Sequence, residues 1–121
     1  MTIDQIASRL VELCRRCEYD AAQKELYADD VVSVEPDGTP GNVVRGRAAL
    51  IEKNKMFHDT FAVHGGSASD PVCADPFFSY AMSADVTDKR SGARFTISEI
   101  CVFEVRDGKI VREQFFYPPK G

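Results

Sequence analysis

Two glutamates in an otherwise apolar strand pattern are the residues of this sequence best placed to do chemistry. Between Arg94 and Pro118, two runs of alternating β-branched and aromatic residues flank Asp107-Gly108, which is a strong hairpin signal. Because side chains alternate between the faces of a strand, one face is predicted to be apolar except for Glu99 and Glu113. A carboxyl group in apolar surroundings is costly to ionise, and when two such groups lie close together, the pKa of at least one of them is raised. The pair is therefore a candidate proton-transfer site.

The distance between these acids depends on the register of the hairpin. A type I turn followed by Gly108 in a left-handed bulge makes Glu99 and Glu113 diagonal neighbours. In that register the facing pairs are Val105 with Lys109, Phe103 with Val111, Cys101 with Glu113, and Glu99 with Phe115. A plain two-residue turn would instead shift the register by one residue and separate the acids. A further alternative is that the acids reach the rim or bond to Arg94 or Arg112.

Histidine and tyrosine offer further candidate groups. His64 begins an extended segment, and if it points inward it can form an acid/base couple with Glu99 or Glu113 near neutral pH. The alternative is a histidine bonded to a backbone carbonyl. Tyr80 is a candidate donor to a ligand carbonyl, although a strand tyrosine also serves as core. Two carboxylates and a histidine can bind a metal, but their spacing matches no known site, so no metal or other cofactor is expected.

Length and charge limit the partners. The chain has 121 residues, which predicts a single domain over 1–121. A net charge of -4 without a basic stripe argues against nucleic acid and anionic membranes. Charged residues in the first dozen positions exclude a signal-peptide core and a membrane span, so a cytoplasmic location is expected. The four cysteines form no disulfide framework, and Cys14-Arg15-Arg16-Cys17 lies at the wrong end of a helix for a redox motif.

The elements that must position these residues follow from periodicity and turn signals. A helix capped by Thr2 and Gln5 comes first, and a short helix capped by Asp20 follows. The later segments are a strand over 31–35, a helix over 47–60 with Phe57 on its apolar face, an extended segment over 63–74 interrupted at Asp70-Pro71, a strand over 77–87, and the closing hairpin. Helices followed by a meander of strands predict an α+β fold.

This order of helices and strands resembles the nuclear transport factor two-like superfamily. Two segments carry the resemblance as well, LYADDVVSVEP at 26–36 and DGKIV at 107–111. Ketosteroid isomerase and the SnoaL-like polyketide cyclases belong to this superfamily, and the sequence looks most like the uncharacterised SnoaL-like branch. The resemblance implies a cone in which a strongly curved, mostly antiparallel sheet and three helices enclose an apolar pocket. It also implies a homodimer through the outer face of the sheet, where Thr96, Ile100, Val102 and Phe116 would otherwise be exposed.

The resemblance assigns further residues to the pocket. Glu35 before Pro36 falls where ketosteroid isomerase has its general base, and the positions of Glu113, Phe115 and Tyr117 point into the family's cavity. The isomerase's tyrosine and neutral aspartic acid fall at about Leu10 and Cys101, so steroid isomerisation is not implied. The ligand-binding set expected here is Tyr80, Phe57, Cys101, Phe115 and Tyr117.

The leading hypothesis is a cofactor-independent isomerase, cyclase or lyase that binds a small apolar, carbonyl-bearing metabolite and moves protons with Glu35, Glu99, Glu113 and His64. The alternative is a non-catalytic ligand-binding or dimerisation module, because a fold alone does not specify a function. A redox or metal protein is the third hypothesis, and it depends on Cys14 and Cys17 or on the acid-histidine set.

Overall fold

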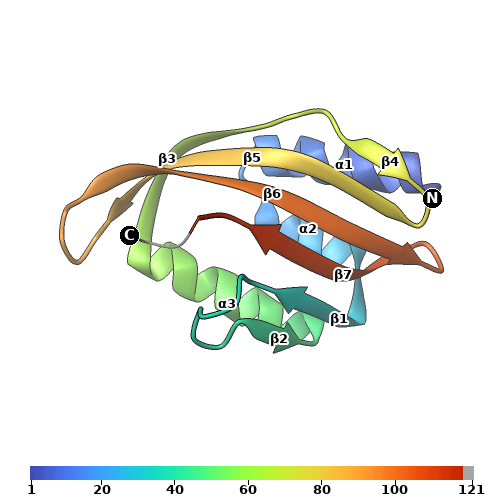
Figure 1. Cartoon of the computed structure of the whole chain (residues 1–121), viewed down its shortest axis with the longest axis horizontal. Helices are drawn as coiled ribbons and strands as arrows, with labels where there is room; N and C mark the ends of the chain where they lie inside the picture. Colours follow the sequence, from blue (N-terminus) through green and yellow to red (C-terminus); the bar gives the residue numbers. More distant parts are fainter. Residues whose placement is uncertain (119–121) are drawn as a thin grey trace.

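Helices occupy the first half of the chain, and long strands occupy the second half (Figure 1). The computed structural model describes residues 1–118. The elements are α1 (Ile3–Arg15), α2 (Tyr19–Leu26), β1 (Tyr27–Val34), β2 (Val43–Arg45), α3 (Arg47–Thr60), β3 (Phe61–Ala68), β4 (Val72–Ala74), β5 (Phe77–Asp88), β6 (Arg94–Arg106) and β7 (Lys109–Phe116). The predicted α+β class is confirmed.

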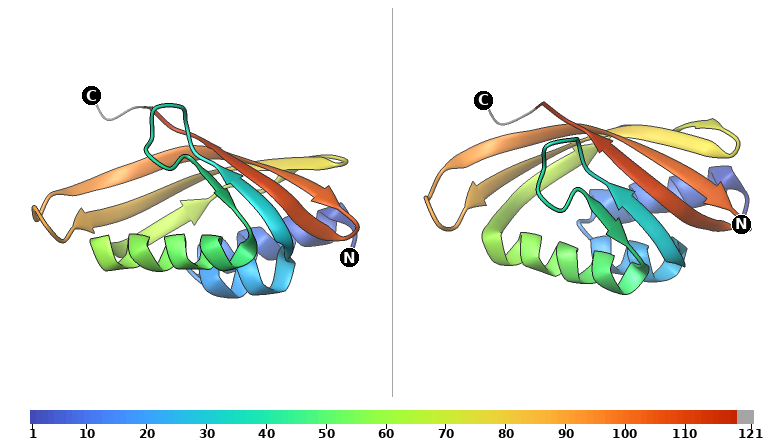
Figure 2. Two further views of the ribbon diagram at one scale, coloured as in Figure 1. Left: turned by 90° about the horizontal axis from the view of Figure 1, so that it is seen from below. Right: turned by 60° about the horizontal axis from the view of Figure 1, so that its bottom comes forward.

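One curved, open sheet carries all the described strands. Its order is β2-β1-β7-β6-β5-β3, and β4 pairs with β5 beside this path. The pairs are antiparallel except that β1 runs parallel to β7. Figure 2 shows the strands arching over the helices, which lie on one side of the sheet. This arrangement gives the sheet an inner face toward the helices and an outer face away from them.

Among the three helices of residues 1–118, α1 alone begins with a side-chain cap. Thr2 and Gln5 form the predicted capping box of α1. The prediction that Asp20 caps α2 is wrong, because this helix begins at Tyr19 after Glu18, which makes no side-chain cap. The Asp20 carboxylate instead accepts a hydrogen bond from Asn54 of α3 at 2.5 Å. A tertiary contact between α2 and α3 thus uses the group that the sequence pattern assigns to the helix end.

The predicted register of the closing hairpin is also wrong. Asp107 and Gly108 both have positive φ angles, 53° and 74°, as in a two-residue type I′ turn, and Arg106 pairs with Lys109. A bulge then inserts Val111 into β7, so that the pairs beyond it are Glu104 with Arg112, Phe103 with Glu113, and Cys101 with Phe115. The turn and the bulge each shift the register by one residue. The total shift of two keeps Glu113 on the inner face but moves it two positions farther from Glu99.

The core lies between α1, α2 and the inner face of the sheet. Phe103 of β6 stacks on Phe78 and Tyr80 of β5, with ring centroids 4.8 and 5.4 Å apart. The predicted inner face of β5 is confirmed for its buried residues Phe78, Tyr80, Ala84 and Val86. Beside the bulge, Ile110 is fully buried, where the sequence pattern predicts Val111.

Gly66 of edge strand β3 provides a test of the close approach between β3 and β5. A Cβ at Gly66 would lie 2.8 Å from the backbone oxygen of Ser83, whereas a Cβ at Gly65 meets no atom within 4 Å. We expect Gly66→Ala to lower the free energy of unfolding by about 1–3 kcal/mol, since the strands must separate to accept the methyl group. Gly65→Ala, the matched control, should leave it nearly unchanged. Urea denaturation measures both, and equal effects of the two changes would contradict this packing.

Candidate functional site

Glu113 of β7 is a carboxyl group inside the protein. Its residue is only 3% exposed, and its two oxygens accept hydrogen bonds from the Tyr27 hydroxyl and from Ser33 Oγ, the latter at 2.7 Å. Both donors belong to β1, which pairs with β7 so that Ser33 lies beside Glu113. Burial raises the pKa of Glu113, and the two hydroxyl groups only partly oppose this effect. The carboxyl therefore keeps its proton to a higher pH than an ordinary glutamate.

Glu99 lies on the same inner face but is only half-buried. The Cys101 thiol approaches its Oε1 at 3.8 Å. Burial, followed by the negative charges of Glu35 and Glu113, raises the pKa of Glu99 to about 7. At neutral pH the group is thus present in both protonation states, which is the condition for taking and returning a proton efficiently.

Glu35 comes directly after β1 and is ion-paired. Lys53 Nζ, from α3, lies 2.7 Å from Glu35 Oε1, and the two side chains are 34% and 15% exposed. The Tyr117 phenol, just beyond β7, lies near Glu35, and burial, followed by the interaction with Glu35, raises the pKa of Tyr117 to about 12. Glu35 therefore joins the end of β1 to α3 and to the C-terminal side of the sheet.

The three acids have different electrostatic surroundings, as a proton-transfer site requires. The positive charge of Lys53 favours the ionised forms of both Glu99 and Glu113, while the charge of Glu35 opposes them. The site holds one ion-paired carboxylate, one acid that titrates near neutrality and one buried acid with a raised pKa. Two carboxyl groups whose pKa values are shifted by different surroundings can divide the roles of acid and base.

His64 does not belong to this group. It is exposed, and its Nε2 lies 2.7 Å from Thr87 Oγ1 on the neighbouring strand β5. The predicted pairing of His64 with Glu99 or Glu113 is therefore not seen. The bulge between Val63 and Gly65 lies at this position, where the strict alternation of faces does not hold.

Of the predicted ligand-binding residues, Cys101, Phe115 and Phe57 lie near the acids or on α3, whereas Tyr80 lies in the core. Cys101 is fully buried beside Glu99, and Phe115 of β7 is the partner of Cys101 across the hairpin. Phe57 of α3 is half-buried, with its ring centroid 4.9 Å from that of Phe61. The hydroxyl of Tyr80, by contrast, is buried and lies 3.3 Å from Cys14 Sγ, so this tyrosine belongs to the core.

Sequence reasoning missed Lys53, Tyr27 and Ser33. Lys53 lies three residues after the buried Leu50 and four before Phe57, at helical spacing on the inward side of α3. Ser33 shares the alternation of Val31, which is buried. These periodic signals for Lys53 and Ser33 are present in the sequence. The role of Tyr27 depends instead on where α2 ends, because Tyr27 is the first residue of β1.

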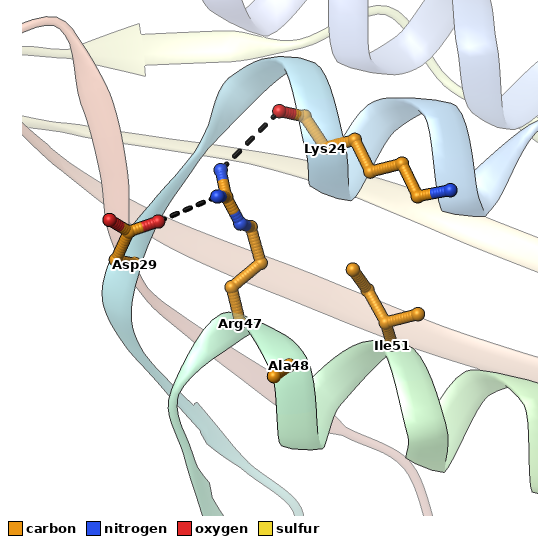
Figure 3. A pocket seen from close by; sticks show the side chains of 5 residues that line it. All are labelled: Lys24, Asp29, Arg47, Ala48 and Ile51. Carbon is orange, nitrogen blue, oxygen red and sulfur yellow. Dashed lines mark hydrogen bonds and ion pairs between the residues drawn. The ribbon is translucent and has the colours of Figure 1, made fainter.

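Two surface hollows lie away from the acids. One, of about 460 Å³, lies between α2 and α3 (Figure 3), where Arg47 forms an ion pair with Asp29 at 2.6 Å and the Lys24 side chain points away from that pair. The other, of about 450 Å³, lies on the outer face over β1, β6 and β7. Neither is the predicted pocket between helices and sheet. The inner-face acids are the better candidate site, because a functional site needs convergent chemistry more than volume.

Residues 1–118 contain neither a metal-binding cluster nor a membrane-spanning helix. No group of three or more histidine, cysteine, aspartate or glutamate residues there has the geometry of a metal site. In the same range, no helix has both the length and the apolar character needed to cross a membrane.

Comparison with known proteins gives a consistent family and fold. A family model described as "SnoaL-like domain" matches residues 1–117. A structure from Mesorhizobium loti, provisionally described as a SnoaL-like polyketide cyclase and in brackets as a carbohydrate phosphatase, is 35% identical, with a TM-score of 0.92 over 97% of this chain and 100% of that one. No curated protein sequence matches significantly.

More distant structures share the fold alone. A nuclear transport factor two-like protein of unknown function from Burkholderia pseudomallei is 17% identical, with a TM-score of 0.81 over 98% of this chain and 92% of that one. A protein with a ketosteroid isomerase-like fold from Catenulispora acidiphila, in complex with trimethylamine, is 15% identical, with a TM-score of 0.75 over 96% of this chain and 87% of that one.

The raised pKa of Glu99 predicts a pH-dependent stability. Between its ordinary value of 4.5 and about 7, the folded state holds more protons at Glu99 than the unfolded state, so stability falls as pH rises through this window. We expect Glu99→Gln to flatten this fall, by up to about 3 kcal/mol between pH 4.5 and 8. Urea denaturation at several pH values measures it. Glu104→Gln, on the outer face of the same strand, is the matched control, and identical pH profiles for wild type and Glu99→Gln would contradict the burial of this carboxyl.

Proposed function

Because the chain belongs to the SnoaL-like domain family, we propose that it binds a small, largely apolar, carbonyl-bearing metabolite against the inner face of its sheet and transfers a proton on it as an isomerase, cyclase or lyase. Proton transfer between two positions of such a molecule requires an acid/base group and needs no cofactor. The description of the Mesorhizobium loti protein as a polyketide cyclase supports the same class of reaction for this chain.

The environment of Glu99 is the observation that carries this proposal. The carboxyl is half-buried, its pKa is about 7, and the surrounding inner-face residues, among them Cys101 and Phe115, are apolar. A group of this kind removes a proton next to a carbonyl in its ionised form and returns it in its neutral form. An apolar ligand matches the lining, since it loses no hydrogen bonds on entering.

The other acids support Glu99 in this proposal. Glu113 contributes a buried acid whose hydrogen bonds to Tyr27 and Ser33 fix its position. Glu35, ion-paired with Lys53, supplies a negative charge that raises the pKa of Glu99. Phe57, Phe115 and Tyr117 are the side chains proposed to contact the body of the ligand. His64 has no role, because it lies on the exposed side of β3.

A non-catalytic ligand-binding or dimerisation module is the second candidate. The outer face of the sheet favours it, because Ile100 of β6 and Phe116 of β7 face each other across the hairpin and are 48% and 49% exposed. Adjacent exposed apolar side chains mark an interaction surface. We propose that a second copy of the chain covers this face, and that the homodimer functions in the cytoplasm, where the four free cysteines stay reduced.

Hydrogen exchange on simple ketones tests the catalytic proposal without knowledge of the natural substrate. α-Tetralone, 2-tetralone and cyclohexenone exchange the protons next to their carbonyl for deuterium in D₂O, which proton NMR follows. We expect the protein to accelerate this exchange with a pH midpoint near 7, as Glu99 ionises. Glu99→Gln should reduce the acceleration by at least about 100-fold, because it removes the base.

Glu104→Gln is the control for this experiment, since it removes a carboxyl from the outer face of the same strand. It should leave the exchange rate unchanged. No acceleration with any of the three ketones, or an acceleration that survives in Glu99→Gln, would contradict the catalytic proposal and favour the binding module.

The size of the protein in solution tests the dimer. We expect light scattering to give twice the mass of one chain, 13.4 kDa, and Ile100→Lys to convert the protein to monomers, because a buried unpaired ammonium is costly. Met56→Lys is the matched control, since Met56 lies on α3 and is 62% exposed. A wild-type monomer, or a dimer unaffected by Ile100→Lys, would overturn this interface.

A further inference from the structure

Lys53 is a cation placed among the acids of the inner face. It lies on the same side of α3 as Leu50, which is buried, and Phe57, which is half-buried. Its ammonium bonds Glu35 Oε1 at 2.7 Å, and its charge acts on both Glu99 and Glu113. An ammonium has three N–H donors, and this ion pair occupies one of them. With its side chain 34% exposed, Lys53 can offer the others to a ligand.

Several of the other donors near the acids already have partners within the protein. The hydroxyls of Tyr27 and Ser33 donate to Glu113. The Tyr80 hydroxyl pairs with Cys14, as described above. On α3, the Asn54 amide donates to Asp20, whereas the ammonium of its neighbour Lys53 faces the acids.

We propose that Lys53 is the oxyanion-binding group of this site, which donates a hydrogen bond to the carbonyl oxygen of an enolisable, uncharged substrate while Glu99 removes the neighbouring proton. This role rests on the function proposed above and extends it to a residue and a substrate class. The ion pair with Glu35 fixes the ammonium before the substrate arrives. Such preorganised charge, aimed at the atom where negative charge develops, is an effective form of catalysis.

The reaction balances with the groups of the site alone. The Glu99 carboxylate takes the proton as the C–H bond breaks, and the electron pair moves through the new C=C bond onto the carbonyl oxygen. Glu99 becomes neutral and the oxygen becomes negative, so the total charge of the site is unchanged. The charge moves from an acid that Lys53 stabilises at a distance to an oxygen that Lys53 contacts directly. Return of the proton to another carbon completes an isomerisation, and attack of the enolate on a second carbonyl, followed by protonation of the new alkoxide by Glu99, completes a cyclisation.

A naphthol is a suitable probe, because its hydroxyl becomes an oxyanion with distinct absorbance and fluorescence. We expect 2-naphthol and 6-cyano-2-naphthol bound to the wild-type protein to ionise at a pH lower by ~1 unit or more than in free solution, as an adjacent cation favours the charged form. Lys53→Met should abolish this shift, and Lys53→Arg should retain most of it. Lys55→Met, an exposed lysine on the same helix, should behave as the wild type.

A second variant separates the loss of the cation from damage to the fold. Lys53→Met leaves Glu35 without its partner, whereas Lys53→Met combined with Glu35→Gln removes both charges. The double variant should keep the circular dichroism and thermal stability of the wild type and still lose the naphtholate signal. Wild-type protein that shows no bound naphtholate, or variants without Lys53 that show it undiminished, would overturn the role of Lys53. After either result, the proposed function still holds if ketone exchange depends on Glu99. Failure of the Lys53 role can therefore be distinguished from failure of the proposed function.

Discussion

The buried carboxyl of Glu113 is the constraint on which the rest of the site depends. A carboxyl removed from water costs several kcal/mol unless its oxygens are hydrogen-bonded. Here the Tyr27 hydroxyl and Ser33 Oγ satisfy it, and they lie near opposite ends of β1, which pairs in parallel with β7. The contact therefore fixes the position of β1 on the sheet. It thereby determines where the chain leaves β1 at Glu35, and hence which residue of α3 can reach that acid.

Burial raises the pKa values of two carboxyl groups of the inner face, Glu99 and Glu113. Glu113 is buried against its two hydroxyl donors, Glu99 is half-buried among apolar side chains, and Glu35 forms an ion pair with Lys53. One inner face therefore holds a carboxylate, an acid poised near neutrality and an acid with a raised pKa. Glu99 and Glu113 are the same residue type, but their environments, and not the side chain alone, determine how each titrates.

Periodicity predicted much of this arrangement, and irregular backbone accounts for most of what it did not predict. The alternation of β5 and β6 placed Tyr80, Glu99 and Cys101 on the inner face correctly. The hairpin register failed for two reasons: Asp107-Gly108 forms the two-residue turn that was the alternative, and the bulge at Val111 depends on pairing between strands and leaves no local signal. The bulge at the start of β3 similarly removed His64 from the site. Lys53 was missed for a different reason, since a lysine on a helix usually faces solvent, and only its spacing from Leu50 indicates otherwise.

The most direct test of the account is an NMR titration of the side-chain carboxyls of Glu99 and Glu113 in the wild-type protein, followed through the carboxyl carbons. The account predicts that Glu99 titrates near pH 7 and that Glu113 titrates above the ordinary glutamate value of 4.5. It would be contradicted if both carboxyls titrated at about 4.5. The inner face would then hold ordinary, solvated acids, and neither the poised base nor its supporting network would exist.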